Sequence, residues 1–84
     1  MARDRSYSSI PKSDLAAVRG AINALIADIR QQREKKGWSQ ERLAEEVGLS
    51  ANMVKAIEQQ QRVPSLQNLV RIGRRLGLSL GFRD

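Results

Sequence analysis

Side chains that can bond to nucleic-acid bases or phosphates are concentrated in one short stretch of the chain. Asn52 can form two hydrogen bonds with adenine, and Lys55 can reach guanine acceptors or a phosphate. Ala51 and Met53 can pack on a thymine methyl group. Because all four lie within residues 51–55, their chemistry indicates recognition and not catalysis.

The composition excludes most catalytic and metal-binding chemistry. The 84 residues include no cysteine and no histidine, which excludes disulfides, thiolate and imidazole metal sites and Ser-His nucleophiles. A chain this short forms one domain at most. We therefore expect no enzyme, no metal and no cofactor. The lack of cysteine suits a reducing cytoplasm, where we expect the protein to act.

The charge balance points to nucleic acid first and to anionic lipid second. The net charge is +6 and the isoelectric point is near 10.8, yet residues 38–62 carry three basic and four acidic side chains. This central segment would therefore read nucleic acid by shape and polar groups, and the flanks would supply attraction. A membrane-surface role for the first helix is the weaker alternative, because Asp14 and Asp28 interrupt its basic residues. No apolar run is long enough to span a bilayer or to form a signal peptide, and we expect no membrane partner.

Apolar periodicity predicts a basic arm at residues 1–12 followed by helices. The first helix should begin with Ser13 as its N-cap and end near Lys36. Ser39, Ser50 and Ser65 should cap helices at residues 40–47, 51–59 and from 66 to the residue before Gly77. The residues expected to face the interior are Ile26, Ile29, Leu43, Ala44, Val47, Val54, Ile57, Leu66, Leu69, Val70, Ile72 and Leu76. Earlier members of the first helix's apolar stripe, Leu15, Val18 and Ile22, fit either the core or a dimer surface.

Residues 40–59 combine two short helices with a glycine-containing turn. Ala44 permits a close helix crossing, and Gly48 can adopt the positive φ that a sharp bend requires. Val54 and Ile57 would hold the second helix against the core and leave its outer face free. A helix held in this way can enter the major groove by its N-terminal end.

The segment 32–50 resembles the Cro/lambda-repressor-type, or XRE-family, helix-turn-helix domain. The resemblance continues through Val54, Ile57, Glu58 and the Pro64-Ser65-Leu66 sequence, and covers roughly residues 26–78. It implies an all-α fold of four to five helices, a DNA-binding domain at residues 13–77 and double-stranded DNA as the partner.

The resemblance also implies roles for individual residues. Gln40 would clamp a phosphate and touch a base edge. The positions that would face bases are Ser50, Ala51, Asn52 and Lys55. The positions that would meet the backbone or groove wall are Met53, Gln59 and Arg62. The blander alternatives are that Asn52 and Lys55 are merely solvated and that Met53 is partly core.

Three further positions have structural expectations. Arg33 and Glu58 match a buried ion pair of the family, and Trp38 is expected to cover the corner between the first two helices. Gln60 departs from the family, which often has glycine there, so the loop that carries Arg62 could be strained or reshaped.

The chain ends in alternating apolar and polar residues, which is strand patterning. We expect residues 78–84 to pair with the same strand of a two-fold mate, with Leu78, Leu80 and Phe82 packed below. This ending resembles that of HipB-type antitoxins; the first helix is the alternative dimer surface. The sequence therefore predicts a homodimeric, sequence-specific repressor of a palindromic operator. The alternative is an antitoxin that neutralises a toxin, such as a HipA-like kinase, and autoregulates its operon.

Overall fold

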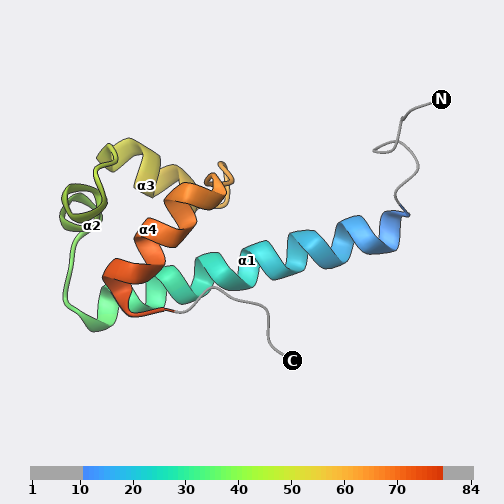
Figure 1. The fold of residues 1–84 in the computed structure, drawn as a ribbon, viewed down its shortest axis with the longest axis horizontal. Helices are drawn as coiled ribbons and strands as arrows, with labels where there is room; N and C mark the ends of the chain where they lie inside the picture. The colour runs from blue at the N-terminus through green and yellow to red at the C-terminus, as the bar shows by residue number, and fades with distance from the viewer. Residues whose placement is uncertain (1–10, 79–84) are drawn as a thin grey trace.

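The computed structural model describes residues 11–78, and these residues form four α-helices without a strand. The helices are α1 (Lys12–Lys35), α2 (Gln40–Val47), α3 (Ala51–Glu58) and α4 (Leu66–Leu76). Figure 1 shows α2, α3 and α4 gathered around the C-terminal half of α1, while its N-terminal half extends beyond them. The predicted all-α class is confirmed. The predicted C-terminal strand lies outside the described residues, apart from Leu78.

Serine caps start the last three helices as the sequence predicts. The hydroxyl oxygens of Ser39, Ser50 and Ser65 accept hydrogen bonds of 3.0–3.1 Å from the backbone N–H three residues later. Each bond satisfies one of the free N–H groups at a helix start and is worth about 1 kcal/mol. These three start points are therefore fixed by local chemistry.

The predicted cap of the first helix is wrong. α1 begins at Lys12, directly after Pro11, so Ser13 lies inside the helix and Lys12 belongs to the helix and not to the arm. The carbonyl oxygen of Pro11 accepts hydrogen bonds from the N–H groups of Asp14 and Leu15 at 3.1 and 3.2 Å. Proline can start a helix without a side-chain cap because its fixed φ suits the helix entrance.

The core lies where the last three helices pack on the C-terminal half of α1. Its buried apolar residues are Ile26, Ile29, Leu43, Ala44, Val47, Val54, Ile57, Ile72 and Leu76. Leu43 has no exposed surface, and burying a leucine contributes about 1.5–3 kcal/mol. Trp38 is half-buried and packs against this cluster, so the predicted cover over the α1–α2 corner is confirmed.

Four residues predicted on apolar faces are largely exposed. Leu66 is 74% and Val70 39% exposed, so the prediction that both face the interior is wrong. They lie in the N-terminal half of α4, and the helix turns Ile72 and Leu76 toward the core. Leu15 and Val18 are 50% and 56% exposed, because the N-terminal half of α1 projects past the other helices. Burial in the monomer core is therefore excluded for Leu15 and Val18, whereas Ile22 is partly buried and packs against the core.

Gln60 adopts a left-handed backbone conformation, with φ of 63°. The loop keeps this shape because its N–H groups bond back to α3: Gln60 donates to Ile57 at 2.9 Å and Gln61 to Ala56 at 2.8 Å. Holding a side chain other than glycine in this region costs about 1–2 kcal/mol. The predicted strain is confirmed, and the hydrogen bonds to the end of α3 offset it.

Replacing Gln60 by glycine should raise the free energy of unfolding by about 0.5–1 kcal/mol, measured by urea denaturation. Glycine removes the left-handed penalty but adds freedom to the unfolded chain, which offsets about 0.4–1 kcal/mol of the gain. Gln61→Gly is the matched control, because Gln61 has no positive φ, and it should lower stability. Equal destabilisation by the two substitutions would contradict the strain.

No helix within residues 11–78 is long and apolar enough to cross a membrane.

Candidate nucleic-acid interface

The turn between α2 and α3 fixes how the second helix is presented. Gly48 ends α2 with φ of 74°, and the N–H of Leu49 bonds back to the carbonyl of Ala44 at 3.0 Å. A Cβ on Gly48 would stand 2.9 Å from a guanidinium nitrogen of Arg71 in α4. The end of the flexible Arg71 side chain could move aside, so it is the backbone conformation that favours glycine here.

The inner face of α3 is held by buried residues, which leaves its other side free. Val54 and Ile57 are 2% and 1% exposed, and they belong to the same core as Ala44. Asn52 and Lys55 lie on the exposed side of the same helix. The packing that the sequence predicts for α3 is confirmed.

A buried ion pair ties α3 to α1. Arg33 donates to Glu58 through Nε at 2.7 Å and through Nη2 at 2.9 Å, and both residues are almost completely buried. A third guanidinium nitrogen, Nη1, donates to the carbonyl of Trp38 at 2.7 Å. This two-point pairing raises the pKa of Arg33 above its usual value, chiefly through the hydrogen bond to Glu58. The arginine is therefore charged at every physiological pH, and the predicted pair is present.

Gln40 joins this network from the start of α2. Its Nε2 donates to Glu58 Oε1 at 3.0 Å. The same carboxylate oxygen also accepts the hydrogen bond from Arg33 Nη2. Glu58 thus connects three helices through one carboxylate. No local sequence pattern predicts the Gln40–Glu58 contact, because the two residues are 18 positions apart.

The predicted DNA-contacting residues divide into two groups by exposure. The exposed ones are Ser50, Asn52, Lys55, Gln59 and Arg62, and the half-buried ones are Gln40, Ala51 and Met53. Ala51 and Met53 pack against the core cluster. The hydroxyl oxygen of Ser50 accepts the hydrogen bond that caps α3. Asn52 and Lys55 are the members of the set that combine exposure with base-reading chemistry on α3.

Two cationic side chains for which the sequence predicts no role lie close to Trp38 at the corner before α2. The Arg42 guanidinium lies 4.9 Å and the Lys36 ammonium 5.3 Å from the centre of the Trp38 ring. Arg42 also pairs with Glu46 at 2.9 Å, one helical turn further along α2. The four-residue spacing between Trp38 and Arg42 is the signal that would have suggested this contact. Both cations therefore lie within cation–π distance of Trp38, at the corner that precedes Gln40.

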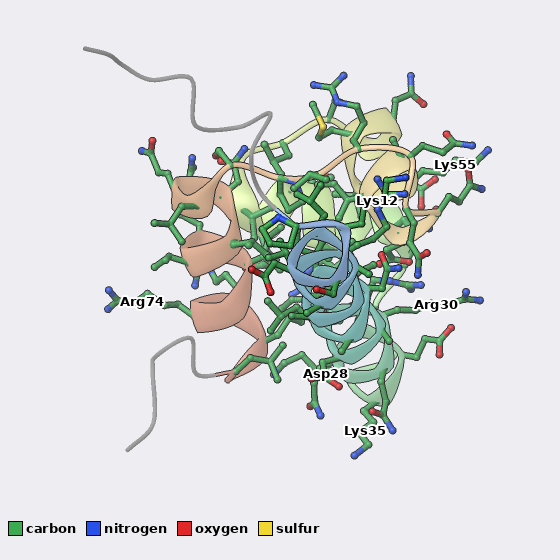
Figure 2. The ribbon with its side chains drawn as sticks, turned by 90° about the vertical axis from the view of Figure 1, so that its right-hand side faces the viewer. Lys12, Asp28, Arg30, Lys35, Lys55 and Arg74 are labelled. Atoms are coloured by element: carbon green, nitrogen blue, oxygen red, sulfur yellow. The ribbon has the colours of Figure 1, made fainter. Side chains whose placement is uncertain are left out.

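The charged side chains are distributed unevenly around the molecule. In Figure 2, Arg30 of α1 and Lys55 of α3 project to the same side, whereas Arg74 of α4 projects to the opposite side. Asp28 lies below α1 in the same view. The exposed face of α3 therefore shares its side of the molecule with positive charge from α1.

The residues that the structure describes contain no group of acidic, histidine or cysteine side chains that could hold a metal ion.

A protein-family model described as "Helix-turn-helix" matches residues 29–82. No curated protein and no solved structure matches the chain significantly. The matched region contains α2, α3, α4 and the end of α1.

Proposed function

The chain belongs to the helix-turn-helix family of the Cro/lambda-repressor type, whose members are DNA-binding transcriptional regulators, and we propose that it is a homodimeric repressor of a palindromic operator. The observation that carries this proposal is the division of α3 into two sides. Val54, Ile57 and Glu58 anchor one side, while Asn52 and Lys55 lie exposed on the other. A rigidly held helix with exposed polar groups can read base edges in the major groove.

Each DNA contact would have a distinct task. Asn52 and Lys55 would bond base edges, and Ala51 and Met53 would offer apolar contact at the start of α3. Gln40, Gln59 and Arg62 would contact phosphates or the groove wall and set the register. Because residues 38–62 carry no positive excess, specificity would depend mainly on hydrogen bonds and shape.

The proposal is tested by selecting bound duplexes from a random pool. We expect enrichment of a two-fold symmetric sequence whose half-sites lie about 34 Å apart, which is one helical turn. Enrichment of an unsymmetric site would overturn the homodimer, and binding without any sequence enrichment would overturn the specific repressor. Expression of a reporter behind the selected site should fall when the protein is produced; a rise would identify an activator.

The proposed dimer has two candidate surfaces. The first is the C-terminal segment with Leu78, Leu80 and Phe82, of which Leu78 packs against the core and the other two lie outside the described residues. The second is the exposed apolar face of α1 around Leu15 and Val18. We favour the C-terminal segment because its alternating pattern suits an intermolecular strand pair. The antitoxin alternative depends on the same segment and would be favoured if the protein co-purified with a larger partner.

Deleting residues 79–84 should convert the dimer to a monomer, as measured by light scattering of the eluting protein. The deletion spares Gly77, which ends α4 with φ of 75°, and the packed Leu78. Val18→Glu tests the α1 surface, and Ala17→Glu is its control because this exposed residue lies on another face of the same helix. A dimer that survives the deletion but is lost in Val18→Glu alone would assign the interface to α1.

A further inference from the structure

We propose that one side of α1, formed by Lys12, Arg19 and Arg30 and here called the α1 basic row, contacts the DNA phosphate backbone beside the site that α3 reads. This inference deepens the proposed function and rests on it. It extends the DNA-binding surface beyond the helix-turn-helix to the part of α1 that projects from the domain.

The row follows from the helical spacing of its members. Lys12 and Arg19 are 7 residues apart, and Arg19 and Arg30 are 11 apart. At 3.6 residues per turn, each step returns to within about 20° of the same side of the helix. At 1.5 Å per residue the row is about 27 Å long. All three side chains are exposed.

Two of the three acidic residues of α1 lie on the side opposite the row, whereas the third, Glu34, lies beside Arg30. Asp14 is two positions from Lys12 and Asp28 nine positions from Arg19, which places each about 160–180° away from the row. Along residues 12–30 the three basic side chains therefore face one side of the helix and the two acidic ones face the other. This separation is what a helix lying along a polyanion requires.

The row is on the same side of the molecule as α3. Arg19 lines a groove together with Gln60 and Val63 of the loop that follows α3. Arg33, three residues after Arg30, bonds directly to Glu58 in α3. In Figure 2, Lys12, Arg30 and Lys55 lie to the same side of the α1 axis, whereas Arg74 projects to the opposite side and Lys35 lies below. A duplex held against α3 would therefore meet the row and leave Arg74 in solvent.

The existing partner of Arg30 does not prevent a phosphate contact. Arg30 Nε lies 3.3 Å from Glu34 Oε2, and the two side chains are 62% and 56% exposed. An exposed pair of this kind contributes little stability. Duplex DNA presents one negative charge per ~1.7 Å of its axis, so phosphates are available along the whole length of the row.

The test compares two double variants that each remove one lysine and one arginine, but from different places on the protein. Lys12→Gln/Arg30→Gln removes one lysine and one arginine from the row. Lys35→Gln/Arg74→Gln removes one lysine and one arginine from other faces of the protein. Binding to a mixed-sequence duplex of about three helical turns is measured by fluorescence anisotropy over a range of salt concentrations, and the fold of each variant is checked by its thermal melt.

The row variant should reduce the slope of log K against log salt by about 1.8, since each phosphate contact contributes about 0.9. The matched variant should change the slope by less than half as much. Equal slopes in the two variants would overturn the α1 basic row and leave the proposed function intact. A wild-type protein that binds no duplex even at low salt would overturn the proposed function and the row together.

Discussion

Replacing Glu58 by alanine is expected to lower the free energy of unfolding by about 3–5 kcal/mol. The substitution leaves the Arg33 guanidinium charged in a site where it is only 9% exposed, and a buried charge without its partner is strongly destabilising. An arginine keeps its proton at ordinary pH even without a partner, so Arg33 cannot relieve the cost by becoming neutral. Gln40 loses a hydrogen-bond acceptor in the same variant. Urea denaturation followed by circular dichroism measures the loss.

Glu34→Ala is the control for this prediction, because Glu34 also pairs with an arginine but is 56% exposed. We expect that control to change stability by no more than about 0.5 kcal/mol. The double variant Arg33→Met/Glu58→Leu should recover most of the loss, since removing both charges leaves none unpaired. It also keeps the prediction testable if Glu58→Ala does not fold. The role assigned to the buried pair is wrong if Glu58→Ala and Glu34→Ala have the same stability.

Replacing Asn52 by alanine should weaken binding to the selected operator by about 1–3 kcal/mol, or roughly 5- to 150-fold. Asn52 is exposed on α3, where its amide can both donate to and accept from one adenine. The loss should be confined to operators that carry the preferred base at one position of each half-site. Titration of the operator and of its single-base variants by fluorescence anisotropy measures both effects.

Arg62→Ala provides the contrasting result. Arg62 is exposed in the loop after α3, and a phosphate contact there would strengthen binding to every sequence alike. We expect this substitution to weaken operator and mixed-sequence DNA by the same factor. If Asn52→Ala also weakened both kinds of DNA equally, the assignment of Asn52 to base recognition would be wrong.

The sequence predicts the parts of this fold that depend on local chemistry. Ser39, Ser50 and Ser65 start helices because a hydroxyl oxygen can bond the N–H three residues later in any surroundings. Gly48 ends α2 because the turn needs a positive φ, and glycine adopts this conformation at little cost whatever its surroundings. The pair of Arg33 and Glu58 was expected through the family resemblance, and its two short hydrogen bonds confirm it.

The incorrect or missing predictions concern features that depend on how helices are placed. Leu66 and Val70 fit the apolar period of α4, but the period does not say how far along the helix the neighbouring helices reach. The exposure of Leu15 has the same cause at the start of α1. The hydrogen bond between Gln40 and Glu58 joins residues distant in the chain, so no local pattern predicts it. The dimer, the operator and the direction of regulation stay predictions.

The N-terminal half of α1 is the part of the fold whose helical order would depend most on a bound partner. Residues 12–21 are all exposed, so tertiary packing does little to stabilise this part of the helix. A helix without such packing is marginal in water, because most helical stability in proteins comes from buried faces. Local opening should therefore begin at Lys12 and meet resistance at the buried Ile26. A partner that binds this segment must supply the free energy to order it. Because the partner binds the folded helix, its binding also raises the free energy of unfolding of the domain.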